Sequence, residues 1–181
     1  MKYQGSKNRI AKDIIPIMLN GMNYGDYFID AFCGGCNLLD KVPNSFNRIA
    51  NDNNEYLVAM FMYLTSGWEP ITHIDRETYN LARDCYNRKC CELFHKHELG
   101  WIGFMASVNG RFFCGGYSGH CVKIGNGNTR DYISESIRNI MPQIPLLKDV
   151  IFRCGNYDEI ELPPATRTTI YCDITYKGVK Q

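Results

Sequence analysis

The hydrophobic pattern of residues 1–70 alternates between helical and strand-like segments. Apolar residues at helical spacing in 8–19 predict a helix, which Pro16 is expected to kink or to end near residue 15. The apolar run of 54–64 predicts a second helix. Short apolar runs predict strands at Tyr27 to Asp30 and at 48–52. This alternation is typical of an α/β fold.

Two further strands are predicted later in the chain, at Val150 to Cys154 and at Thr168 to Cys172. Runs that stay apolar without polar alternation are expected to be buried on both faces, as in parallel sheets. We therefore predict an α/β fold with a doubly wound, mostly parallel sheet.

The middle of the chain has a different composition. Charged residues mixed with apolar ones in 75–98 predict one or two amphipathic helices that cover an exposed face. Glycine, asparagine and aromatic residues dominate 101–129, which is expected not to form a regular helix and is long for a bare loop. A helix is predicted again at 132–141. We expect 71–144 to be an insertion between the two parts of the main domain, 1–70 and 145–181.

Composition narrows the class of protein. The chain has 181 residues and 45% hydrophobic content, enough for the core of one domain. No apolar run approaches the roughly 20 residues that cross a bilayer, and the first residues lack the apolar core of a signal peptide, so we expect a cytoplasmic protein. Because the formal net charge is only +1, nucleic-acid binding would need local clusters of basic residues. One such cluster is Lys2, Lys7, Arg9 and Lys12.

The candidate chemistry begins where the first strand meets glycines, in YFIDAFCGGCNLL from Tyr27 to Leu39. Glycine has no Cβ, so the backbone at such a junction can approach a nucleotide-like ligand. Asp30 ends this strand, and Asp52 ends the next one 22 positions later. An acid at that second strand tip is placed to accept hydrogen bonds from ribose hydroxyls. The spacing predicts a cofactor site within one βαβ unit.

Taken in order, these segments resemble the Dam-like (D12) class of DNA N6-adenine methyltransferases, over almost the whole chain. The resemblance implies a methyltransferase-like Rossmann fold with a small inserted target-recognition region. It also implies transfer of a methyl group from S-adenosylmethionine to adenine N6 in double-stranded DNA, by a bacterial or phage-encoded enzyme of the restriction-modification type. The segments that carry it are KYQGSK (2–7), DAFCGG (30–35), IANDNN (49–54), FRCGNYDEI (152–160) and YCDITYKG (171–178).

The resemblance also implies roles for single residues. In the family's catalytic tetrapeptide, an aspartate and the next carbonyl accept hydrogen bonds from the amino group, and an aromatic residue stacks on the flipped base. Those roles fall to Asp173, the Ile174 carbonyl and Tyr176. The residues expected to bind the cofactor are Tyr3, Lys7, Asp30, Phe32, Gly34, Asp52, Asp158 and Asp173, and those expected to meet DNA are Asn109, Arg111 and Tyr117.

Two departures from the family pattern leave a second function open. Ile174 and Thr175 replace two prolines whose fixed φ angles hold the catalytic loop rigid, and misplacement by about 1 Å can cost on the order of 100-fold in rate. The chain stops at Gln181, whereas the family continues, so we expect a sheet that is incomplete on its C-terminal side. A further segment or a partner would complete it. The alternative is an inactive DNA-binding or interaction protein with the same fold.

Cysteine and histidine offer two other interpretations. Nine cysteines without an export signal are first interpreted as reduced thiols. Cys33 and Cys36 have the CxxC spacing of redox motifs, although the glycines between them explain the segment better. A zinc-stabilised binding protein is the other alternative, although its candidate ligands lack the tight spacing of common zinc sites. Those ligands are Cys85, Cys90, Cys91, His95, His97, Cys114, His120 and Cys121.

Overall fold

The computed structural model describes residues 1–89, 92–125, 127–164 and 167–174. Its main sheet has four parallel strands in the order β5-β2-β1-β6. The predicted α/β fold with a parallel sheet is confirmed. The strands are β1 (Tyr27–Asp30), β2 (Asn47–Asp52), β5 (Ile151–Cys154) and β6 (Thr168–Tyr171).

The order in which successive strands join the sheet reverses at β1. The chain adds β2 and then β5 on one side of β1, and it returns to add β6 on the other side. In open α/β sheets, ligands bind beyond the carboxyl ends of the strands at such a reversal. Here that place is the gap between the ends of β1 and β6.

The outer strands are less buried than the sequence predicted. β1 and β2 are almost wholly buried, but Ile151 on β5 is 52% exposed and Ile170 on β6 is 44% exposed. The prediction that all four strands are buried on both faces is therefore wrong for the outer pair. Each of these strands has a neighbour on one side only among the described residues. The sheet is thus incomplete at its edges, as expected.

The helices follow the predicted pattern with two corrections. Helix α1 (Ala11–Met18) continues through Pro16, so the expectation of an end near residue 15 is wrong. Pro16 cannot donate a backbone hydrogen bond to the carbonyl of Lys12, but Leu19 N still bonds the carbonyl of Ile15 at 2.9 Å, and the helix continues past the proline. The other helices are α2 (Glu55–Thr65), α3 (Arg76–Arg88), α4 (Lys96–Met105) and α5 (Tyr132–Ile140).

The second correction concerns residues 101–105, which were assigned to the irregular glycine-rich stretch. They form the second half of α4, and all five are buried. Two glycines explain how an apolar helix fits there, because a Cβ on Gly100 would lie 2.2 Å from the carbonyl oxygen of Tyr56 and one on Gly103 would lie 2.4 Å from the ring of Phe112. The irregular stretch therefore begins after Met105, and its first residues pack against the helix.

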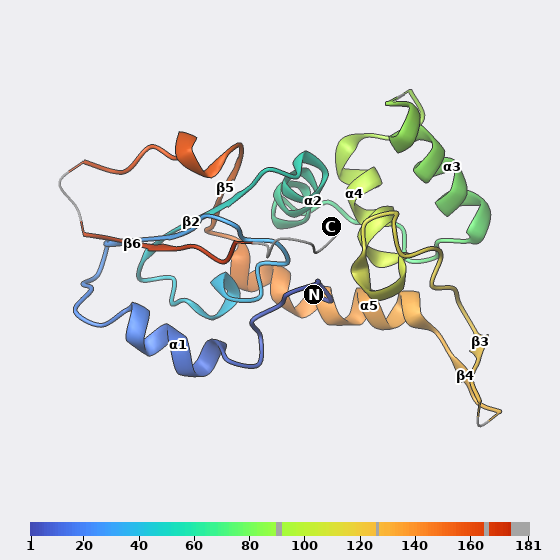
Figure 1. The fold of residues 1–181 in the computed structure, drawn as a ribbon, viewed down its shortest axis with the longest axis horizontal. Helices are drawn as coiled ribbons and strands as arrows, with labels where there is room; N and C mark the ends of the chain where they lie inside the picture. The colour runs from blue at the N-terminus through green and yellow to red at the C-terminus, as the bar shows by residue number, and fades with distance from the viewer. Residues whose placement is uncertain (90–91, 126, 165–166, 175–181) are drawn as a thin grey trace.

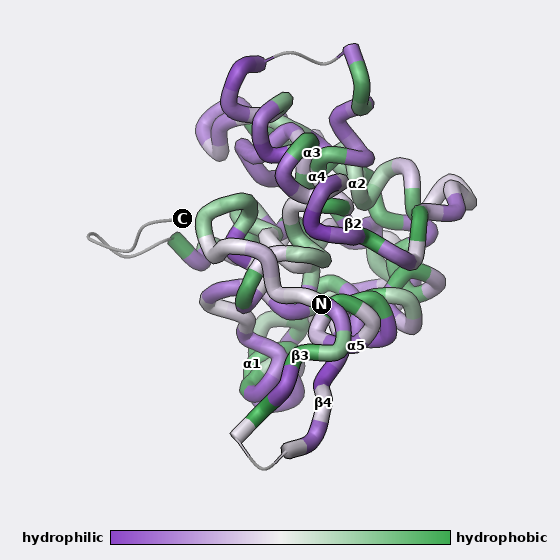
Figure 2. The backbone as a smooth tube through the Cα atoms, turned by 90° about the vertical axis from the view of Figure 1, so that its right-hand side faces the viewer, coloured by the Kyte–Doolittle hydropathy of each residue, from purple (hydrophilic) through white to green (hydrophobic). Residues whose placement is uncertain are grey.

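Part of the irregular stretch forms a hairpin that the sequence analysis did not predict. Strands β3 (Val122–Lys123) and β4 (Thr129–Arg130) pair antiparallel and are exposed along their length. The hairpin projects from the body of the molecule in both views (Figures 1 and 2). Figure 1 also shows the sheet on the left, helices α3 and α4 with the hairpin on the right, and the N-terminus between them.

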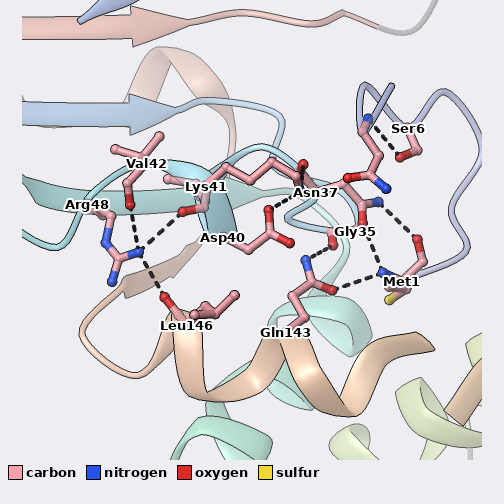
Figure 3. A network of polar contacts seen from close by, with 12 residues as sticks. Met1, Ser6, Gly35, Asn37, Asp40, Lys41, Val42, Arg48, Gln143 and Leu146 are labelled. Atoms are coloured by element: carbon pink, nitrogen blue, oxygen red, sulfur yellow. Dashed lines mark hydrogen bonds and ion pairs between the residues drawn. The ribbon is translucent and has the colours of Figure 1, made fainter. Parts of the chain in front are cut away.

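A buried arginine ties β2 to its surroundings (Figure 3). Arg48 is 4% exposed, and its Nη1 donates to the carbonyls of Leu39, Val42 and Leu146 at 3.3, 3.1 and 2.8 Å. These carbonyls belong to the short helical turns at Leu39–Lys41 and Met141–Leu147 and their flanks. Charged donors suit this position because the ends of helices leave carbonyls unpaired.

The helices among the described residues are all too short or too polar to cross a bilayer.

The close contact of α2 and α4 gives a test of the fold. We expect Gly100→Ala to destabilise the protein by about 1–3 kcal/mol, because the new Cβ must displace the backbone of α2. The measurement is urea unfolding followed by circular dichroism. Gly125→Ala is the matched control, since its Cβ would have no neighbour within 4 Å, and it should change stability by less than about 0.5 kcal/mol. Equal effects of the two changes would contradict this packing.

Candidate functional site

A cavity of about 940 Å³ opens at the carboxyl ends of the central strands, where the sheet reverses its growth. Its wall is made by the N-terminal turn, the glycine segment after β1, the end of β2, the segment after β6 and aromatic residues between positions 86 and 112. Its lining includes Tyr3, Lys7, Asp30, Phe32, Gly34, Asp52, Tyr86, Phe104, Arg111, Phe112, Asp173 and Ile174.

Asp52 holds the glycine segment through a hydrogen bond to its backbone. One carboxylate oxygen of Asp52 accepts the backbone N–H of Gly34 at 3.0 Å, and the other accepts that of Asn54 at 2.9 Å. Burial raises the pKa of Asp52, and these hydrogen bonds oppose that rise. Each oxygen has two lone pairs, so each keeps acceptor capacity for a ligand.

The side chain of Tyr3 packs against the same segment. Gly34 has a positive φ of 45°, and a Cβ on it would lie 2.5 Å from the ring of Tyr3. A Cβ on Gly35 would lie 2.8 Å from the Cβ of Tyr3. Any larger residue at these two positions would push the N-terminal segment away. The glycines therefore serve the packing of Tyr3 as well as access to the backbone.

A third contact comes from the helical turn Met141–Leu147 (Figure 3). Gln143 is 4% exposed, and its amide nitrogen donates to the carbonyl of Gly35 at 2.9 Å. Asn37, just after the glycines, donates to the carbonyl of Met1 at 3.1 Å. Three separate parts of the chain thus fix the glycine segment.

Lys7 joins the N-terminal turn to the segment after β6. Its Nζ lies 2.5 Å from a carboxylate oxygen of Asp173 and donates to the carbonyl of Gly5 at 3.1 Å. Both side chains of the ion pair are largely covered, at 26% and 22% exposed. The ion pair fixes the position of the Asp173 carboxylate at the cavity wall.

Asp30 is the most deeply buried acid of the site, at 2% exposed. Burial raises its pKa to about 7, the backbone N–H of Phe32 opposes the rise, and the nearby carboxylates of Asp173 and Asp52 add to it. The Phe32 amide lies 3.3 Å from the carboxylate. Asp30 therefore changes its charge near neutral pH.

The structure brings most of the predicted cofactor residues together, but not all. Asp158 is exposed on the short turn Tyr157–Glu159 and is not part of the cavity lining. Its neighbour Tyr157 approaches instead, with its ring centroid 5.3 Å from that of Phe32. Tyr176, with Thr175, lies outside the described residues. Ile174 lines the cavity and is 61% exposed.

The three residues expected to meet DNA lie in different surroundings. Arg111 lines the main cavity, and Asn109 lines a smaller cavity beside it. Tyr117 lines neither of the two. Its hydroxyl donates to the carbonyl of Ile74 at 2.7 Å, and the guanidinium of Arg76 lies 4.8 Å from its ring centroid. In this structure Tyr117 therefore packs the insertion internally.

The cavity has an aromatic wall whose members the sequence analysis did not bring together. Tyr86 comes from α3, Phe104 from α4 and Phe112 from the irregular stretch. The ring centroid of Phe112 lies 4.9 Å from that of Tyr86 and 4.8 Å from that of Phe104. The sequence analysis placed Tyr86 only within the amphipathic segment 75–98 and gave Phe104 no role. No spacing in the sequence marks aromatic residues from separate elements as neighbours.

The thiols do not have the character of a redox pair. Cys33 and Cys36 are buried, and their Sγ atoms lie 4.0 and 3.9 Å from the carbonyl oxygen of Gly34. The hydrogen bond that the Cys33 thiol donates to Cys36, together with burial, raises the pKa of Cys33, and burial raises that of Cys36. Reactive CxxC pairs need a lowered pKa, so these thiols fit a structural role.

The zinc alternative gains no support from the part of the chain that is described. No group of three His, Cys, Asp or Glu residues is arranged there to hold a metal ion. His120 is instead paired with Asp131 at 2.9 Å, and its ring stacks on His73 with 4.5 Å between centroids. Cys90 and Cys91 lie outside the described residues.

Two comparisons with known proteins bear on this site. A protein-family model described as D12 class N6 adenine-specific DNA methyltransferase matches residues 3–94, about half of the chain. The match includes the N-terminal turn, the glycine segment and Asp52, and it ends before Arg111 and Asp173. A search of curated proteins finds no match.

The pKa of Asp30 predicts how stability depends on pH. Its value rises from 3.8 to about 7 on folding, so the protonated form stabilises the native state at low pH, and this contribution is lost as the pH rises toward 7. Between pH 5 and 7 the difference in unfolding free energy between wild type and Asp30→Asn should therefore fall, by at most about 1.4 kcal/mol per pH unit, and level off above pH 7.5.

Urea unfolding of both proteins at a series of pH values measures this difference. Asp84→Asn, which removes an exposed acid on α3, is the matched control. A constant difference between wild type and Asp30→Asn over that range would show that Asp30 titrates at its ordinary value.

Proposed function

Because the chain belongs to the D12 class of N6 adenine-specific DNA methyltransferases, we propose that it transfers a methyl group from S-adenosylmethionine to adenine N6 in double-stranded DNA. One observation carries the proposal. The N-terminal lysine turn, the glycine segment, Asp52 and Asp173 come from distant parts of the chain and line one cavity at the reversal of the sheet.

The lining suits the proposed cofactor in charge and size. S-adenosylmethionine carries positive charge at its sulfonium and its amino group, and the acids Asp30, Asp52 and Asp173 line the cavity. The volume of about 940 Å³ lies at the upper end of the range of small-molecule sites. Asp30 and the glycine segment would hold the methionine end, and Asp52 the ribose hydroxyls. When bound, the cofactor supplies a methyl group that its sulfonium already activates.

The acceptor half of the reaction is proposed to depend on Asp173. The N6 lone pair of adenine is delocalised into the ring, and hydrogen-bond acceptors on the amino protons localise it. The Asp173 carboxylate and the Ile174 carbonyl would supply these acceptors, and the ion pair with Lys7 would keep the carboxylate in place. The aromatic wall of Tyr86, Phe104 and Phe112 offers an apolar surface for a base taken out of the duplex.

A second candidate function follows from Ile174. This residue stands where the D12 class has proline in its catalytic tetrapeptide, and its side chain is 61% exposed at the cavity wall. A loop without the fixed φ of proline can leave the carbonyl misdirected. A protein that binds cofactor and DNA without turnover is therefore the alternative to the enzyme.

Cofactor binding tests the part that both candidates share. Calorimetric titration with S-adenosylmethionine should show binding that tightens between pH 6 and 8, because Asp30 becomes an anion in this range and the ligand is a cation. Asp30→Asn should weaken binding at pH 8 by about tenfold, which is 1.4 kcal/mol, and remove the pH dependence. Absence of binding by the wild type at any pH would refute the proposed cofactor.

Methyl transfer separates the two candidates. With tritiated cofactor and mixed-sequence DNA, the wild type should label DNA, and Asp173→Asn should lower the rate by about 100-fold or more, because the negative charge is lost and an NH2 donor replaces one of the two acceptor oxygens. The double change Ile174→Pro with Thr175→Pro is the companion variant. Labelling by this variant and none by the wild type would favour the inactive module.

A further inference from the structure

A second, smaller cavity of about 440 Å³ lies directly beside the main one. Four residues line both cavities, so the two are separated by a single layer of side chains. The shared residues are Tyr3, Gln4, Ser6 and Arg111, and the smaller cavity is completed by Met1, Lys2 and Asn109.

The chemistry of this lining is that of an anion site. Its polar side chains are two cations, two amides, a serine hydroxyl and a tyrosine, and it has no carboxylate. The main cavity differs, because it is lined by three acids. The main cavity also contains the cations Lys7 and Arg111, so the cavities differ in that carboxylates line the main one alone. This difference suits a ligand whose anionic part lies in the smaller cavity.

The two cations of the smaller cavity are not equivalent. Lys2 is paired with Glu135 at 3.0 Å, and Glu135 also accepts two hydrogen bonds from Arg130, both at 2.8 Å. Arg111 is exposed, and its guanidinium has no ion pair within the part of the chain that the structure describes. Arg111 is therefore the cation that remains available to a ligand.

The backbone fixes Arg111 at the wall that the cavities share. Asn109 has a left-handed conformation with a φ of 57°, and Gly110 has a φ of 66°. A Cβ on Gly110 would lie 2.5 Å from the carbonyl oxygen of Lys2, so this turn is in close contact with the N-terminal segment. A left-handed residue other than glycine carries strain that surrounding contacts must hold, as is common at binding sites.

We propose that the smaller cavity binds the phosphodiester group next to the target adenine, with Arg111 as its principal cation. The inference rests on the proposed function, since it assigns the base to the main cavity. A nucleotide that leaves the duplex takes its phosphate with it, so a base pocket needs an anion site at its rim. The site would select a nucleotide within a chain over a free nucleoside.

Salt dependence of DNA binding tests the role of Arg111. Each neutralised phosphate adds about 0.9 to the slope of log affinity against log salt on duplex DNA. We expect Arg111→Gln to reduce that slope by about 1 and to lower kcat/KM for DNA by about tenfold or more. Arg111→Lys should keep the slope and restore part of kcat/KM. Arg138→Gln, an exposed arginine of α5 that lines neither cavity, should leave both unchanged.

Small ligands identify the anion. In NMR titrations of the cofactor-bound protein, the methyl phosphodiester of deoxyadenosine should bind more tightly than deoxyadenosine, and Arg111→Gln should remove this preference. Equal binding of diester and nucleoside by the wild type would overturn the proposal, as would inorganic phosphate binding as tightly as the diester.

The outcomes separate this inference from the proposed function. Methyl transfer by the wild type with an unchanged salt slope in Arg111→Gln would refute the phosphate site and leave the enzyme standing. A reduced slope and a lost diester preference, without methyl transfer by the wild type, would support the phosphate site and refute the proposed turnover.

Discussion

The site depends on how firmly the glycine segment after β1 is held. Asp52 at the end of β2 accepts the Gly34 amide, Tyr3 of the N-terminal turn covers the segment, and Gln143 of the turn Met141–Leu147 bonds the Gly35 carbonyl. The residues that make the three contacts are spread over 140 positions of the chain, from Tyr3 to Gln143. The shape of the cavity is thus a property of the whole chain, although its sequence signature is only a few residues long.

The parts of the structure that local pattern determines were predictable. Four apolar runs gave the four strands, and acids at strand ends gave Asp30 and Asp52, because the end of a strand fixes where its last side chain lies. The pairing of Lys7 with Asp173 had no such signal. The resemblance to the family implied a role for both residues, but their contact depends on the pairing of β6 with β1, which brings the segment after β6 to the N-terminal turn.

The features that the sequence analysis predicted wrongly or not at all have a common physical cause, which is packing between distant elements. Residues 101–105 look irregular because of glycines and aromatics, yet those glycines let α4 lie against the backbone of α2. Tyr86 and Phe104 look like core residues of helices, yet they face a cavity. The exposure of β5 and β6 likewise depends on which neighbours are present, and the composition of a strand does not report that.

The double use of Asp52 affects how any experiment on this residue should be interpreted. Both of its oxygens already accept backbone amides, that of Gly34 in the glycine segment and that of Asn54 at the start of α2. Replacing it would remove those supports together with any contact to a ribose. Lost affinity at this position alone would therefore not distinguish a collapsed loop from a missing ligand contact, and a structure of the variant would be needed to decide between them.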